Sequence, residues 1–384
     1  MTKHTKPNRD KVMRFNEFKQ YAENKVGNQP VINTRTLTGM LKSVRPAGGA
    51  GEKAYIDKML SSIRRMGYTP IIDDAGNIIV NNLPTTDATS MVMFASHTDS
   101  VHRTDSPDGT QQLAFKSDDR TIVGLASQDK QQLGVKPNCL GADCATGNYI
   151  MLRLLQANAK GLYVFFREEE VGGIGSEFFR NDPQNEKYWD KLTHCISFDR
   201  KGYTSIITAQ WGGECASDAF ADDLAEAIAV ADVNKRLDAF VADPTGSFTD
   251  SANFTDVISE CTNLSVGYFN QHTTSETQDL QFADDLCDAL CRIDWTELNS
   301  YRDPKETTVY SRATAKSSGY TWVDHSYPFG SQSDYGAYYD DYMDDPSVLL
   351  ADLHYNLQHG GLEYAKELVI NSPEQAAELL IYLA

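Results

Sequence analysis

Two histidines and four acidic residues occur in sequence contexts that suit a pair of metal ions. They are His97, Asp143, Glu169, Glu170, Asp199 and His272. Histidine offers zinc a neutral nitrogen ligand, and carboxylates offer oxygen ligands. A hydrolytic two-metal centre combines both types and keeps a further carboxylate free to move protons. The set of residue types therefore predicts a co-catalytic metal site.

The first two members of the set have distinctive neighbours. Two-residue spacing places His97 and Asp99 on the same face of an extended segment. Asp99 could then accept the second imidazole N–H and fix the tautomer of the ligand. Asp143 lies between Gly141 and Gly147, where a helix is about to begin. A carboxylate at that junction can bridge two cations, and the alternative is an ordinary N-cap aspartate.

Glu169 and Glu170 are adjacent carboxylates that come after an apolar run at 161–167, separated from it only by Glu168. Such neighbours repel one another unless a positive charge lies close to them. One can bind a metal while the other transfers protons. The glycines after them permit a tight turn close to the ions: Gly172, Gly173 and Gly175. A solvated acidic patch is the alternative interpretation.

Asp199 ends another apolar run, where an uncompensated carboxylate would be costly. Metal binding would remove that cost, although Arg200 or Lys201 could neutralise the charge instead. His272 offers the second imidazole, so that each metal would have one. His102 is close enough to the first histidine to compete as a ligand, and we expect the remaining histidines to be structural or on the surface.

The order of elements predicts a layered α/β fold. Continuous apolar runs at 91–95, 161–167, 194–198 and 263–268 are typical of strands buried on both faces. Helical periodicity appears at 34–44, 51–66, 148–156 and 218–229, and residues 71–80 read as two short strands around a turn. Alternating strands and helices indicate a mostly parallel central sheet flanked by helices. Ligands gather at the carboxyl ends of such strands, where the predicted metal ligands lie.

We expect three regions in the chain of 384 residues. Residues 1–300 form the catalytic domain, with its core at about 34–295. A connector at 301–345 contains a stretch rich in Tyr and Asp. Residues 346–384 form a helical C-terminal extension, whose last helix opens with the capping pattern Ser372-Pro373-Glu374-Gln375.

Composition limits the cellular location and the kinds of binding partner that we expect for this protein. The net charge of −19 argues against nucleic acid or an anionic membrane as a partner. No apolar run approaches the roughly 20 residues of a membrane span, and residues 1–10 lack the apolar stretch of a signal peptide. The seven cysteines are scattered without a CxxC pair, which favours a reduced, cytoplasmic protein. The oligomeric state is left open.

These motifs together make residues 34–295 resemble the di-zinc exopeptidase superfamily, which includes leucyl aminopeptidases, glutamate carboxypeptidases and tripeptidases. The resemblance implies a three-layer fold and two zinc ions, with cobalt or manganese as alternatives. It also implies a division of labour, in which His97 and Asp199 hold one ion and Glu170 and His272 the other. Asp143 would bridge them, Glu169 would be the general base and acid, and Asp99 would orient the first histidine. A cis peptide bond between Asp143 and Cys144 is expected by the same resemblance.

The number of residues between predicted ligands favours one branch of this superfamily. From Asp199 to His272 the chain advances 272 − 199 = 73 residues, too few for an inserted lid domain of about 100 residues. That resembles the lidless aminopeptidase branch, which the phrase at 249–251 partly matches. The 44 residues from Asp99 to Asp143 are more than usual there, so we expect a hairpin or small insertion. Cys144 replaces a second acid that does not bind metal in the family.

The function implied is metal-dependent hydrolysis of a peptide or amino-acid amide. An aminopeptidase leads, in which a hydroxide bridging the metals attacks the carbonyl and Glu169 takes its proton. A deacylase or carboxypeptidase on the same site is the alternative, with Arg200 or Lys201 as the nearby candidates to bind a substrate carboxylate. A peptide-binding protein without activity is the third reading, which the complete ligand set disfavours.

Overall fold

The computed structural model describes residues 32–86, 88–103, 105, 110–126, 139–210 and 213–305. All of them lie in the first of two compact units, Met1–Glu306. The predicted connector therefore lies outside the described residues except for 301–305, and the predicted C-terminal extension lies entirely outside them.

An eight-stranded sheet, in the order β1-β2-β6-β3-β7-β12-β8-β11, forms the centre of this unit. Its strands are β1 Ile71–Ile72, β2 Ile78–Asn82, β3 Val92–His97, β6 Gly161–Phe166, β7 His194–Arg200, β8 Ser205–Ile207, β11 Val241–Asp243 and β12 Glu260–Ser265. The four strands from β6 to β12 run parallel to one another, as does the edge pair β8–β11. The predicted mostly parallel sheet is thus confirmed, and β3 and β6 are buried along their whole length.

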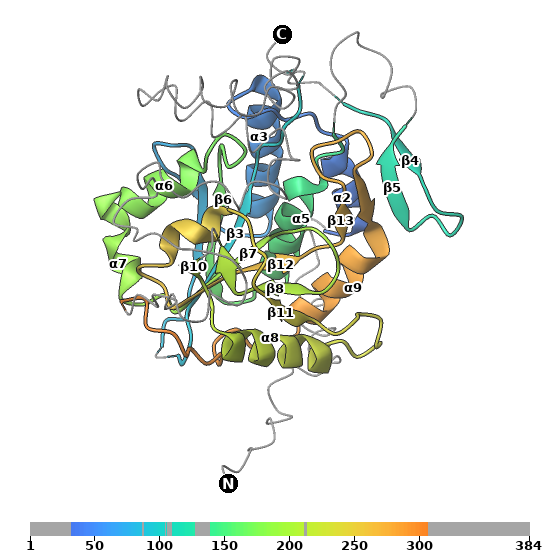
Figure 1. Ribbon diagram of the computed structural model, residues 1–384. Helices are drawn as coiled ribbons and strands as arrows, with labels where there is room; N and C mark the ends of the chain where they lie inside the picture. The colour runs from blue at the N-terminus through green and yellow to red at the C-terminus, as the bar shows by residue number, and fades with distance from the viewer. Residues whose placement is uncertain are drawn as a thin grey trace, which may run out of the picture. The chain divides into compact units, whose positions relative to one another are not determined.

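Helices cover both faces of the sheet (Figure 1). They are α2 Thr34–Leu41, α3 Ala50–Arg65, α5 Ala142–Gln156, α6 Ile174–Asn181, α7 Glu186–Trp189, α8 Asp218–Ala231 and α9 Leu280–Leu290, with the 3₁₀ turns η2 Pro183–Asn185 and η3 Asp250–Phe254. Helix α5 packs on β3 and β7 and against α2 and α9. The turn η3 packs on β3, β7 and β12 and against α6. None of the described helices is long and apolar enough to cross a membrane.

The ends of two predicted elements bear on the site. Helix α5 spans Ala142–Gln156, but Asp143 and Cys144 within it have non-helical backbone angles, so the regular helix begins beyond them, nearer the predicted start at 148. The strand expected at 263–268 is β12, which starts at Glu260 and ends at Ser265. Gly267 then adopts a left-handed φ of 87° and turns the chain into a separate short strand.

A second, four-stranded antiparallel sheet has the order β13-β14-β5-β4. It consists of β4 Leu113–Phe115, β5 Ile122–Leu125, β13 Tyr268–Phe269 and β14 Thr277–Asp279. Strands β4 and β5 form the hairpin expected between Asp99 and Asp143, and it pairs with β14. The described residues of 201–267 hold β8, β11, β12, α8 and the short pair β9 Ala209–Gln210 and β10 Gly213–Glu214. They contain no separate lid domain, as the spacing predicted.

Candidate metal centre

Three neighbouring strands deliver most of the predicted site residues to one edge of the main sheet. His97 is the last residue of β3, Glu169 and Glu170 follow β6, and Asp199 is the second-last residue of β7. Because β6, β3 and β7 are adjacent and parallel, their carboxyl ends meet at the same edge (Figure 1). The structure therefore brings together side chains that are up to about a hundred residues apart in sequence.

His97 is completely buried, and its ring points between acidic side chains. Nε2 lies 2.9 Å from Oδ1 of Asp143 and 3.6 Å from Oδ1 of Asp199, with Oε2 of Glu169 at 4.0 Å. On the other side of the ring, Nδ1 lies 3.2 Å from Oδ1 of Asp99. That carboxylate also accepts the backbone N–H groups of the two glutamates after β6, each at 3.1 Å. Asp99 thus holds both the histidine and the glutamate turn.

Asp143 faces both histidines. Its Oδ1 lies near His97, and its Oδ2 lies 3.2 Å from Nε2 of His272. Nε2 of His272 is also 3.0 Å from Oε2 of Glu170. Two oxygens of one carboxylate thus point to two different imidazoles, an arrangement suited to a carboxylate shared by two cations. The peptide bond from Asp143 to Cys144 is cis, as expected.

Besides His97, Asp199 is contacted by hydroxyl groups and not by the neighbouring arginine. Its Oδ2 accepts a hydrogen bond of 2.7 Å from Thr249, and the hydroxyl of Tyr268 lies 3.3 Å from Oδ1. Arg200 instead pairs with Asp243 at 3.3 Å and bonds Thr245, so it does not neutralise Asp199. Burial raises the pKa of Asp199 to about 7, with the Asp143 carboxylate adding to the effect.

Buried acidic side chains crowd the site and shift one another's pKa values and that of His97. Burial raises the pKa of Glu169 well above its usual value, and the neighbouring carboxylates of Asp199 and Glu170 add to that shift. Burial opposes the charge of His97, but nearby acids, led by Asp199, outweigh it and raise its pKa well above normal. Glu170 also keeps one buried oxygen, Oε1, without a hydrogen-bond partner. Clustered buried carboxylates with an unused oxygen fit divalent cations.

Two groups of side chains among the described residues meet the geometry of a metal site, with ligand atoms within 4.8 Å of one another. One comprises His97, Asp143 and Glu170, and the other His97, Cys144 and Asp199. The Cys144 thiol donates a hydrogen bond of 3.1 Å to the carbonyl of Phe198, one residue before Asp199. In this structure the thiol holds the end of β7.

His102 is not part of the cluster. It is buried, and its Nδ1 accepts a hydrogen bond of 3.3 Å from the backbone N–H of Arg45. Burial lowers the pKa of His102 to about 3, so it is neutral at physiological pH. Of the other histidines, His194 is a buried strand residue that contacts the carbonyl of Asn299 at 3.0 Å.

Sequence reasoning missed two buried acids beside the ligands. Glu276 accepts the backbone N–H of Gly141 at 2.8 Å and that of Asp143 at 3.2 Å. Asp250 is 1% exposed, raises the pKa of Glu169 by its charge, and itself has a pKa raised to about 7, mainly by burial. A glutamate four residues after a ligand and an acid in a partly matching phrase were the available signals, and neither indicates a role alone.

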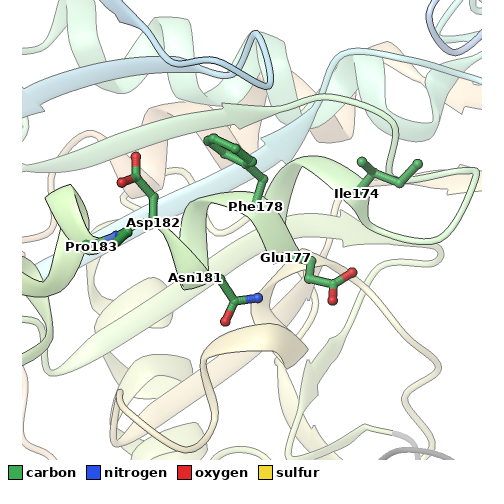
Figure 2. Close-up of a pocket in the computed structure, with 6 residues that line it drawn as sticks. All are labelled: Ile174, Glu177, Phe178, Asn181, Asp182 and Pro183. Carbon is green, nitrogen blue, oxygen red and sulfur yellow. The ribbon is translucent and has the colours of Figure 1, made fainter.

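A separate groove lies beside the glutamate turn on α6 (Figure 2). It encloses about 460 Å³ and is lined by Ile174, Glu177, Phe178, Asn181, Asp182 and Pro183. Its apolar walls are exposed, with Ile174 at 47% and Phe178 at 37%. None of the predicted metal ligands lines this groove, so it is distinct from the metal centre.

Comparison with known proteins gives a family match. The sequence profile of peptidase family M28 matches residues 77–307. A tripeptidase structure from Staphylococcus aureus is 15% identical, with 69% of this chain and 99% of that chain covered at a TM-score of 0.49. An aminopeptidase from Legionella pneumophila is 14% identical, with 79% of each chain covered and a TM-score of 0.49. No curated protein is significantly similar to the chain.

Proposed function

This chain belongs to peptidase family M28 and is a metallopeptidase, and we propose that it is an aminopeptidase that uses two zinc ions. The observation that carries the proposal is the position of Asp143 between His97 and His272, with one carboxylate oxygen within 3.2 Å of each ring. One ion would be held by His97 and Asp199, and the other by Glu170 and His272. Cobalt or manganese could occupy the same ligands.

Bound metals would polarise the carbonyl of the scissile bond and lower the pKa of a water molecule. Glu169 supplies the proton transfers, taking a proton from the attacking water and giving it to the leaving amine. Its side chain is nearly buried and lies 4.0 Å from Nε2 of His97, at the centre of the cluster. Asp99 orients that histidine from behind and fixes the backbone of Glu169 by accepting its N–H.

The charge of the site supports an aminopeptidase over a carboxypeptidase or deacylase. Arg200, the residue that could have bound a substrate carboxylate, is engaged by Asp243 and Thr245. Lys201 is exposed. Buried acids whose charge acts on Glu169, including Asp250, favour a substrate whose end nearest the metals is a positively charged ammonium group.

The test is a panel of aminoacyl anilides and amino-acid amides against N-acyl amino acids and peptides with a blocked N-terminus. We expect hydrolysis only of substrates with a free amino group, with loss of activity in a chelator and recovery on adding zinc. Faster turnover of N-acyl amino acids would replace this proposal by the deacylase or carboxypeptidase alternative. Metal analysis that found no bound ion after reconstitution would refute the site itself.

We also propose that residues 1–300 are the catalytic domain, with 301–345 as connector and 346–384 as helical extension. Arg302 donates to the carbonyls of Ser259 at 2.7 Å and Ile258 at 3.2 Å, so a truncated enzyme should end after residue 305. Activity of that fragment tests the division. The seven cysteines are all free and buried, which supports a cytoplasmic location.

A further inference from the structure

The turn that carries Asp143 is held by two buried side chains, one acidic and one basic. Glu276 accepts the N–H groups of Gly141 and Asp143, at 2.8 and 3.2 Å. Nη2 of Arg45 donates to the carbonyls of the same two residues, Gly141 and Asp143, at 2.6 and 3.2 Å. Nε of Arg45 donates to the carbonyl of Thr98 at 2.9 Å, next to His97. The described hydrogen bonds of the Arg45 guanidinium all run to backbone carbonyls of Asp143 or of residues within two positions of a predicted ligand.

Glu276 also belongs to the loop that carries His272. That loop joins β13 to β14, and Asn270 and His272 within it have left-handed φ angles of 54° and 63°. Glu276 is the last residue before β14, whose Thr277 pairs with Gly124 of β5. The second sheet therefore fixes Glu276, and its carboxylate links the His272 loop to the start of α5, 135 residues earlier in sequence.

We propose that Glu276 is a positioning residue that sets the distance between His272 and Asp143, and so determines binding of the second metal. The inference rests on the proposed two-metal function. Glu276 does this through geometry, because two carboxylate oxygens accept two N–H groups that point the same way. Arg45 holds the carbonyls of the same turn against the segment after β3. Glu276 and Arg45 together are called the clamp.

A glutamine at this position tests the requirement for two acceptors. In Glu276 the two N–H groups are accepted by two separate oxygens. Glutamine replaces one of these oxygens by an NH₂ group, which cannot accept a hydrogen bond and would oppose one N–H group. The turn must then shift, while size and burial stay almost unchanged. Residues that orient metal ligands typically change affinity by about 10–100-fold when altered. We expect Glu276→Gln to weaken binding of at least one zinc ion by about tenfold or more.

Glu260→Gln is the matched control. Glu260 is equally buried and also accepts backbone N–H groups, those of Ser217 at 2.8 Å, Tyr301 at 2.7 Å and Arg302 at 3.0 Å. It lies at the start of β12, at the opposite end of that strand from the metal centre. A general loss of stability should appear in both variants, whereas a loss of zinc affinity should appear only in Glu276→Gln.

Zinc affinity and stoichiometry are measured by competition with a chromophoric chelator, on metal-free full-length protein whose fold is checked by circular dichroism. Wild type should bind two ions; if it binds none, the proposed function fails and not merely this inference. A folded Glu276→Gln that binds both ions with wild-type affinity would overturn the inference, as would an equal loss in Glu260→Gln. If Glu276→Gln does not fold, Arg45→Lys decides, with Arg292→Lys as its buried control. Unchanged zinc affinity in Arg45→Lys would then overturn the clamp.

Discussion

Replacing Glu169 by glutamine should separate proton transfer from metal binding. Glutamine keeps the size and polarity of the side chain but cannot accept a proton. The backbone at this position does not depend on the side chain, because its N–H donates to Asp99 at 3.1 Å. The side chain is 11% exposed and lies 4.0 Å from Nε2 of His97. The substitution should therefore leave the position of the ligands intact.

The expected loss of turnover follows from the role of Glu169 in proton transfer. General acid–base catalysis is typically worth about 10²–10⁴-fold, which is about 2.7–5.4 kcal/mol of barrier at about 1.36 kcal/mol per tenfold. Turnover of an aminoacyl anilide by Glu169→Gln should fall by at least about a hundredfold. Metal content should stay near that of wild type. Glu170→Gln should first lose metal and lose activity as a consequence, because Oε2 of Glu170 lies 3.0 Å from Nε2 of His272.

Glu168→Gln is the control for charge loss in the same turn. Glu168 is 27% exposed on its side chain and pairs with Arg167 at 3.2 Å, away from the histidines. This variant should retain both metal and turnover. The assay is single-substrate kinetics together with metal analysis of each purified protein. Full activity in Glu169→Gln, or loss of metal from that variant while Glu170→Gln keeps it, would refute the assignment of the two glutamates.

Three further outcomes are expected. His97→Ala and His272→Ala should each lower metal content in elemental analysis, whereas His102→Ala should not; the reverse pattern would refute the ligand set. Burial lowers the pKa of His102 to about 3, below the roughly 6.5 of an unfolded histidine. The contribution of neutral His102 to folding stability is therefore present above pH 6.5. It is lost as pH falls toward 3, by about 1.4 kcal/mol per pH unit. Urea unfolding of His102→Gln should show a shallower acid decline than wild type, and equal slopes would contradict this. Gly141→Ala should destabilise the fold by about 1–3 kcal/mol, since φ is +72° and the new Cβ would lie 2.7 Å from Cε1 of His102; an unchanged melting temperature would count against it.

The sequence alone determined where the main strands lie and which metal-binding side chains come at their carboxyl ends. Runs such as 91–95 and 161–166 are apolar because the strands they form are buried on both faces. Parallel strands place their carboxyl ends together, so the positions of His97, Glu170 and Asp199 at one edge followed from order alone. The small number of residues between Asp199 and His272 likewise indicated that no separate lid domain is inserted between them.

Only the tertiary structure decided which partners each side chain meets. Arg200 follows Asp199 directly, yet it turns to Asp243, because successive side chains of a strand point to opposite faces. The contact of Glu276 with Gly141 joins residues 135 positions apart. Local periodicity carries no information about such contacts, because they depend on how β14 pairs with β5 and how both sheets pack around α5.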